Sequence, residues 1–163
     1  MTRSPLLLFS FLLISSLLFT SGCKNKCDGP NLNVNSEQLA IDIAIIDDYL
    51  TENNIEATEH PSGLRYTITR QGDGNSHNAC DRIAIAYTGK TLDGTIFDES
   101  KDPVSFGLTS LITGWQIGLP LLKEGGRITL YIPSVYAYGA SGAGSDIGPN
   151  ESLIFEIYLL RVL

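Results

Sequence analysis

The stretch RIAIAYTGKTLDGTIFD, residues 82–98, decides the fold class of this chain. Within residues 82–87, larger apolar side chains alternate with alanine, a period of two that is typical of a β-strand with one buried face. The pair Asp93-Gly94 is a strong turn signal, and strand character resumes over residues 95–98. The stretch therefore predicts two neighbouring strands joined by a tight turn.

Strand patterns recur on both sides of this hairpin. Further strands are predicted over residues 64–69, 127–132 and 153–162. One short helix is expected over residues 113–119, because Pro120 cannot continue it. Strands outnumber helices, so the predicted class is α+β, with an antiparallel sheet of about five strands wrapped around a short α-helix.

An additional helix is predicted ahead of the sheet, in the segment 36–59. Its apolar residues recur at helical spacing and form one stripe. They are Leu39, Ile43, Ile46 and Leu50. The stripe can pack on the chain's own domain or against a partner, and a dimer through this N-terminal helix is the second alternative. Ile41 and Ile45 widen the stripe and keep both alternatives open.

Residues 1–22 have the pattern of a secretory signal peptide: a charge at Arg3, an apolar run and small residues at the end. The apolar run of about 14 residues is shorter than the roughly 20 of a membrane-spanning helix. The residues before Cys23 resemble a bacterial lipobox, with Thr20 where Leu is usual. That resemblance implies acylation of Cys23, and an incidental cysteine after a plain signal peptide is the alternative.

The segment 23–35 is predicted to be a lipidated, flexible tether, since it is rich in Asn, Lys, Asp, Gly and Pro. We therefore expect an exported lipoprotein of the cell envelope, with the membrane as a partner through the lipid at Cys23. Lys24 stands where an Asp often signals retention in the inner membrane. By analogy, this favours the outer membrane, with the domain facing the periplasm.

Charge and cysteine content exclude several classes of function. The 163 residues carry a formal net charge of −7, and loss of residues 1–22 removes only Arg3, which changes it to −8. No basic cluster is present, so nucleic-acid binding is not expected. Cys27 and Cys80 can form a disulfide in an oxidising compartment or remain free thiols. No spacing of Cys and His indicates a metal site, and no cofactor is expected.

The candidate chemistry is that of a binding pocket without a covalent step. His60 and His77 lie in polar, loop-like stretches, and no Ser-His-Asp or Cys-His set is indicated. Aromatic residues cluster in the strand and loop segments instead. Asp98 follows Phe97 within this aromatic set, and an acid beside an apolar pocket usually has a hydrogen-bonding role.

Four linked blocks resemble the FKBP-type peptidyl-prolyl cis/trans isomerases. They are Tyr87-Thr88-Gly89 with Phe97-Asp98-Glu99-Ser100, Ile112-Thr113-Gly114-Trp115, Tyr136-Ala137-Tyr138-Gly139, and Leu153-Ile154-Phe155-Glu156. The blocks follow the family's order at nearly its spacing and place the isomerase domain at residues 60–163. The resemblance implies a curved antiparallel sheet around a short helix, with the pocket between them.

The resemblance also implies roles for individual residues. Trp115 would form the pocket floor, and Tyr138 would donate its hydroxyl to a substrate carbonyl. Asp98 would be a buried acid that bonds to Tyr87 or polarises the bound peptide group. Substrate-binding positions would be Phe97, Val104, Phe106, Leu111, Ile112, Ile147 and Phe155, with Ile112 and Ile147 acting through backbone N–H groups. Many family members carry an aromatic residue at the position of Val104, so the wall is thinner there.

These features predict an isomerase that rotates X–Pro bonds in exported polypeptides and assists their folding in the cell envelope. Macrolide-type inhibitors are a further ligand class that the resemblance implies. A non-catalytic peptide-binding chaperone or assembly factor on the same fold is the main alternative. A lipoprotein that captures small molecules or glycans is a third reading, which the core-like positions of the aromatic residues disfavour.

Overall fold

The computed structural model describes residue 27 and residues 29–163. The predicted signal peptide and the candidate lipidation site Cys23 lie outside this range. The helices are α1 (Ser36–Glu52) and α2 (Thr113–Gly118), and the strands are β1 (Thr58–Glu59), β2 (Arg65–Arg70), β3 (Arg82–Thr91), β4 (Ile96–Gly107), β5 (Arg127–Ile132) and β6 (Leu153–Val162). Neither helix has the length and apolar composition needed to cross a membrane.

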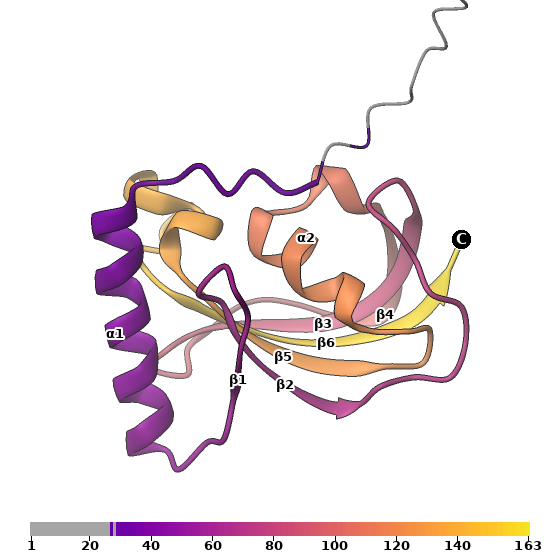
Figure 1. Ribbon diagram of the computed structural model, residues 1–163, viewed down its shortest axis with the longest axis horizontal. Coiled ribbons are helices and arrows are strands. Elements are labelled where there is room, and N and C mark those ends of the chain that lie inside the picture. Colours follow the sequence, from indigo (N-terminus) through magenta and orange to yellow (C-terminus); the bar gives the residue numbers. More distant parts are fainter. Residues whose placement is uncertain (1–26, 28) are drawn as a thin grey trace, which may run out of the picture.

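The six strands form one antiparallel sheet in the order β1-β2-β5-β6-β3-β4. Figure 1 shows this sheet curving beneath α2, with α1 lying at one end of the sheet. The predicted fold class is confirmed, and β5 and β6 have the predicted bounds. The difference is one additional strand, β1, which is two residues long and pairs with β2.

The main core lies between the curved sheet and α2. It contains Ile83 and Ile85 of β3, both 0% exposed, and Trp115 of α2, 4% exposed. Helix α2 approaches the sheet closely because it presents glycine at two positions one turn apart. A Cβ atom at Gly114 would collide with Ile132, and one at Gly118 would collide with Leu130. The two glycines therefore set the depth at which α2 lies in the sheet.

Helix α1 begins where the side chain of Asn35 accepts hydrogen bonds from the backbone N–H groups of Glu37 and Gln38, at 3.0 and 3.1 Å. It ends at Glu52, earlier than the predicted segment 36–59. The chain turns there because Asn54 adopts a φ of +54°, which a helix cannot accommodate. Residues 58–59 then pair with β2, so they are strand and not helix.

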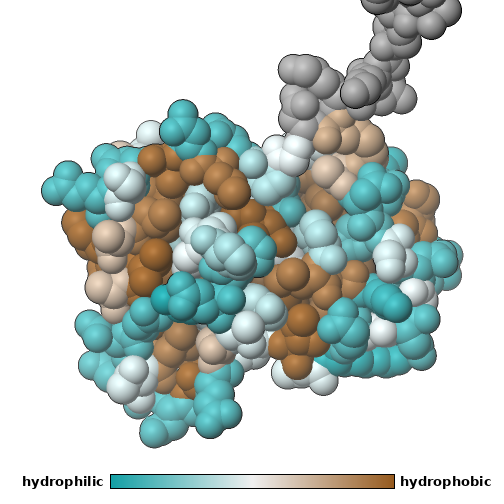
Figure 2. All heavy atoms as spheres, in the orientation of Figure 1, coloured by the Kyte–Doolittle hydropathy of each residue, from teal (hydrophilic) through white to brown (hydrophobic). Residues whose placement is uncertain are grey.

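The apolar stripe of α1 packs on the chain's own domain. Ile46 and Leu50 are buried against Tyr131 and Ile154, which lie at the ends of β5 and β6. Ile41 and Ile45 remain 49% and 45% exposed. Figure 2 shows hydrophobic residues at the surface on the left, where α1 lies in Figure 1.

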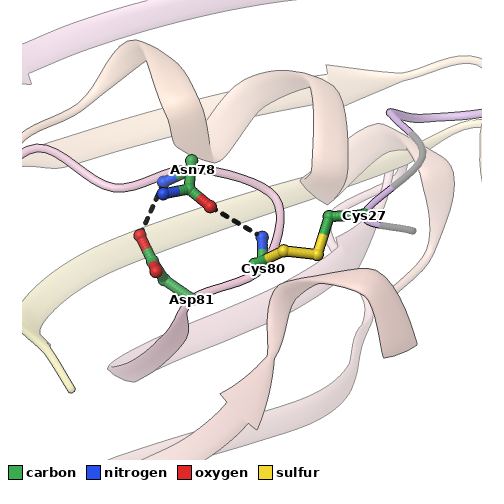
Figure 3. The surroundings of a disulfide bond; sticks show 4 residues. All are labelled: Cys27, Asn78, Cys80 and Asp81. Atoms are coloured by element: carbon green, nitrogen blue, oxygen red, sulfur yellow. Dashed lines mark hydrogen bonds between the residues drawn. A yellow bond between two sulfur atoms is a disulfide. The ribbon is translucent and has the colours of Figure 1, made fainter. Parts of the chain in front are cut away.

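The segment that leads into α1 is attached to the domain at two points. Cys27 forms a disulfide with Cys80 in the loop before β3 (Figure 3). Val34, near the other end, packs against the main core. The part of the predicted flexible tether that the structure describes therefore lies along the domain, and Figure 1 shows it running from α1 across to the region of α2.

The loop that holds Cys80 is itself braced by hydrogen bonds. The Cys80 N–H donates to the side chain of Asn78 at 2.9 Å, and the Asn78 N–H donates to the carboxylate of Asp81 at 2.8 Å. The carbonyl of Asp81 accepts from the N–H of Leu108 at 3.1 Å. The disulfide is thus connected to the segment that follows β4.

We predict that the disulfide stabilises the fold substantially. It closes a loop between residues 53 apart in sequence, and loss of such a cross-link costs about 4 kcal/mol in the chain-entropy account. Denaturant unfolding of a form starting at Lys24, with and without reductant, measures the effect. The Cys27→Ser/Cys80→Ser double variant is the control, because reductant should not change its midpoint. Equal midpoints for oxidised parent and double variant would contradict the prediction.

Candidate active site

A cavity of about 340 Å³ opens between the sheet, the start of α2 and the loop that joins β5 to β6. Its lining is mostly aromatic and aliphatic, and four of the side chains carry a hydroxyl or carboxylate group. The lining residues are Tyr87, Asp98, Phe106, Ser110, Leu111, Ile112, Trp115, Tyr138 and Phe155. All but Ser110 belong to the predicted site, so residues from four separate regions of the chain meet here.

Three aromatic rings form the floor and the back wall. The Trp115 ring lies 5.0 Å from Phe155 and 5.1 Å from Tyr87, measured between ring centroids, and both contacts are edge-to-face. Such contacts stabilise the set beyond simple burial. Because α2 carries Trp115 and is set in depth by Gly114 and Gly118, the floor has a fixed position relative to β3 and β6.

Phe97 lies behind this set and does not line the cavity. Its ring packs edge-to-face on Phe155 at 5.5 Å. Both rings occupy the space over Gly89, where a Cβ atom would lie 2.7 Å from each of them. Gly89 is therefore a supporting residue of the site. The sequence analysis quoted it in the Tyr87-Thr88-Gly89 block but gave it no role.

Tyr87 and Asp98 form the polar pair of the wall, through a hydrogen bond of 2.7 Å from the Tyr87 hydroxyl to the Asp98 carboxylate. Burial, and then the Asp98 carboxylate, raise the pKa of Tyr87 to about 12. Asp98 itself is exposed, which corrects the expectation of a buried acid. It stands at the cavity rim because β4 is the edge strand of the sheet.

Tyr138, in the loop between β5 and β6, also lines the cavity and is 39% exposed. Burial and the charge of Asp98 raise the pKa of Tyr138, so it too stays protonated at neutral pH. Its hydroxyl has no hydrogen-bond partner within the described part of the chain. The hydroxyl is therefore available to donate to a bound molecule.

The two expected backbone donors differ. Ile112 precedes α2, and across residues 27 and 29–163 we find no acceptor for its N–H. The N–H of Ile147 donates to the carbonyl of Ala143 at 3.2 Å, and the reverse bond measures 2.9 Å. This bridge closes the loop from Gly142 to Ile147, so Ile147 lines no part of the cavity and its N–H is already used.

The remaining predicted wall positions are placed as follows. Phe106 and Leu111 line the cavity, and the side-chain amide of Gln116 fixes the Leu111 carbonyl at 2.7 Å. Val104 pairs with Ile85 across β3 and β4 and packs against the main core without lining the cavity. Ser110 is a lining residue that the sequence analysis missed, and it had no signal beyond its place before Leu111.

A second hollow, of about 450 Å³, lies mainly on the other face of the sheet. Glu156 lines it and alternates with Phe155 along β6, which places the two side chains on opposite faces. Lys101 and Arg127 also line this hollow, and it contains no buried aromatic floor. Among the residues described, no group of acids, His or Cys is arranged to hold a metal ion.

The domain model of the FKBP-type peptidyl-prolyl cis-trans isomerases matches residues 74–160. The chain belongs to this family. The matched range holds every residue that lines the 340 Å³ cavity, so the candidate site lies within the FKBP domain. The sheet extends further, since β2 precedes the matched range and pairs with β5.

Named relatives of this FKBP domain agree with the assignment. A probable FKBP-type isomerase FkpA from Neisseria meningitidis is 48% identical over 104 residues, 62% of this chain and 38% of that protein. The outer membrane protein MIP of Legionella longbeachae is 39% identical over 105 residues, 63% of this chain and 45% of that protein. The chain thus spans less than half the length of these two relatives.

A solved structure matches most of the FKBP chain. The crystal structure of a peptidyl-prolyl cis-trans isomerase from Pseudomonas syringae superposes with a TM-score of 0.67 at 34% sequence identity. The match covers 76% of this chain and 94% of that one. The predicted family and the predicted fold are therefore both confirmed.

We predict that the raised pKa of Tyr87 depends partly on Asp98. Subtracting the tyrosinate absorbance of Tyr87→Phe from that of the parent leaves the signal of Tyr87 alone. This signal should titrate with a pKa of about 12, above the ordinary value of 10.0. In the Asp98→Asn background the same difference should move toward 10.0 without reaching it, because burial remains. An unchanged titration would show that the carboxylate does not act on this hydroxyl.

The direction of the pH effect on stability follows from the same shift. The pKa of Tyr87 is raised in the folded state. The contribution of its protonated side chain to the free energy of unfolding is therefore fully present below about pH 10 and is lost as the pH rises through about 12. The Tyr87→Phe variant should therefore show less loss of stability than the parent over that alkaline window.

Proposed function

We propose that this protein is a peptidyl-prolyl cis/trans isomerase that acts on X–Pro bonds of polypeptides exported to the cell envelope. The observation that carries the proposal is the cavity floor, Trp115, which is only 4% exposed and is bordered edge-to-face by Tyr87 and Phe155. A flat apolar floor of this kind fits a proline ring. The Tyr138 hydroxyl and the Ile112 N–H provide hydrogen-bond donors beside it.

The reaction requires no nucleophile. Resonance in the peptide bond sets a rotation barrier of roughly 18–20 kcal/mol, and exchange without a catalyst takes on the order of 10–100 s. A site accelerates rotation when it binds the twisted amide better than either planar form. In the twisted form the nitrogen is pyramidal and the planar charge-separated resonance form is lost. An apolar enclosure disfavours that charge-separated form and so lowers the barrier.

In this proposal, each residue of the cavity has its own part. Trp115 and Phe155 hold the proline ring, while Tyr138 donates to a carbonyl of the substrate and fixes one side of the rotating bond. Tyr87 keeps its proton at neutral pH, so its hydrogen bond to Asp98 persists and holds the wall in place. Asp98 stands at the rim, where its charge polarises the bound peptide group. A macrolide-type inhibitor would occupy the same cavity.

Location in the envelope is part of this proposal. A lipid on Cys23 would attach the protein to a membrane, with the outer membrane favoured. The relative from Legionella longbeachae is named as an outer membrane protein. The Cys27–Cys80 disulfide further supports an oxidising, exported compartment.

We predict that a form starting at Lys24 accelerates cis/trans exchange of a proline-containing tetrapeptide. The Asp98→Asn variant should lower kcat/KM on the order of tenfold, since a hydrogen bond to a charged group contributes about 1.5–3 kcal/mol. Glu99→Gln is the matched control, because Glu99 is the next residue of β4 and is not among the cavity-lining residues. A folded parent without activity would favour the peptide-binding module, and equal losses in both variants would refute the role of Asp98.

We predict that Cys23→Ser releases the protein from the membrane fraction. Fractionation of cells that express parent and variant, followed by detection of the protein in each fraction, measures this. Cys27→Ser is the control. It removes the disulfide but should stay with the membrane, because Cys23 is unchanged. A Cys23→Ser variant that remains in the membrane fraction would contradict the lipid anchor.

A further inference from the structure

One fully buried carboxylate lies outside the cavity, and the chemistry above does not use it. Asp42 of α1 is 0% exposed. One of its oxygens accepts from the side-chain amide of Gln38 at 2.8 Å. The other accepts from the Ser134 hydroxyl at 2.7 Å and from the Val135 N–H at 3.3 Å. A buried carboxylate is costly unless it is hydrogen-bonded in this way, so a simple packing contact would be made more cheaply by an apolar residue.

The two partners of Asp42 on the sheet side begin the turn that carries Tyr138. Ser134 and Val135 open a 3₁₀ turn, η3 (Ser134–Tyr136), directly after β5 and Pro133. Its backbone is closed by the bond from the Ala137 N–H to the Ser134 carbonyl, at 2.9 Å. Tyr138 follows one residue later and points its ring into the cavity lining.

A second contact holds the other side of the same turn. The hydroxyl of Tyr136 donates to the carbonyl of Ser62 at 2.9 Å, and the Tyr136 side chain is 2% exposed. Ser62 precedes Gly63, which lies directly under the Ile43 side chain of α1. Turn η3 is therefore clamped between α1 and the segment that α1 covers. Tyr138, by contrast, has no side-chain hydrogen bond of its own among the described residues.

We propose that Asp42 is a positioning residue for the isomerisation, a role that rests on the proposed function. By accepting from Ser134 and Val135, it fixes the start of η3 and so the direction in which Tyr138 presents its hydroxyl to the substrate. Helix α1 then takes part in catalysis, because its contact with η3 determines the orientation of the Tyr138 hydroxyl.

The same helix offers a matched control, a residue that attaches α1 to the sheet but makes no contact with η3. Asp47, five residues after Asp42, forms a two-armed ion pair with Arg65 of β2, with N–O distances of 2.9 and 3.0 Å. This contact also attaches α1 to the sheet, but β2 carries no residue that lines the cavity. Loss of Asp47 should weaken docking while η3 stays held, whereas loss of Asp42 should release η3.

The experiment compares steady-state isomerisation by the purified full-length protein and its variants. Asp42→Ala and Ser134→Ala should each lower kcat by about tenfold with little change in KM, because the lost contact aims a donor used during rotation. Asp42→Asn should be intermediate, since its amide oxygen can still accept from Ser134 and Val135 but, being neutral, binds them less strongly than the carboxylate does. Asp47→Asn should stay within about twofold of the parent at a similar or larger loss in melting temperature.

A double-mutant cycle separates positioning from general stability. In the Tyr138→Phe background the donor is already absent, so Asp42→Ala should have almost no further effect on kcat. Additive effects of the two substitutions, or an Asp47→Asn loss as large as that of Asp42→Ala, would overturn the inference and leave the proposed function standing. A folded parent without activity would overturn the proposed function and this inference together. If Asp42→Ala does not fold, Asp42→Asn and Ser134→Ala replace it in the cycle.

Discussion

The close approach of α2 to β5 is the contact on which the rest of the molecule depends. Gly114 and Gly118 carry no side chain where Ile132 and Leu130 stand, so the helix lies directly on the sheet. This depth sets the height of Trp115 relative to the aromatic rings from β3 and β6. A helix held farther away by one methyl group would lift the floor away from Tyr87 and Phe155. The cavity thus depends on what two positions lack as much as on the rings that line it.

Around the contact between α2 and β5, further contacts attach α1 and the segment before it to the domain, and those of α1 with turn η3 and β2 are polar. Two carboxylates of α1 reach the sheet region at separate points, Asp42 at turn η3 and Asp47 at Arg65 of β2. The disulfide and Val34 attach the preceding segment. The N-terminal part of the chain therefore contacts three regions of the domain: turn η3, strand β2 and the loop before β3. It is better described as a brace than as an appended helix.

Much of the fold could be predicted from the sequence, and the exceptions have physical reasons. Strands β5 and β6 have strict apolar patterns on their buried faces and were placed to the residue. Strand β4 was predicted to end at Asp98 but continues to Gly107. Residues 101–103, Lys-Asp-Pro, have the composition of a loop, and an edge strand tolerates them because one side needs no hydrogen-bond partner. Only the assembled sheet shows that β4 is an edge.

The same limit applies to the site. The family resemblance was enough to predict eight of the nine lining residues, six of them within its linked blocks and two, Phe106 and Leu111, between blocks. The resemblance could not predict how exposed each side chain is or which backbone groups are already hydrogen-bonded. Asp98 is exposed at the rim, and the N–H of Ile147 is used within its own loop. Asp42 stood one residue before Ile43 in the apolar stripe, and an acid at such a position was the only sign of its buried role.

The disulfide also sets how far the domain can travel from a membrane. With an acyl group on Cys23, the disulfide would hold the domain within four residues of the membrane, a distance of at most roughly 14 Å. Opening the bond would leave Val34 as the next contact with the domain, and the eleven residues from Cys23 to Val34 span at most roughly 37 Å. The bonded loop adjoins Leu108, two residues from Ser110 at the cavity wall. With a lipid at Cys23, the oxidation state of this pair would therefore set how far the cavity can stand from the membrane surface.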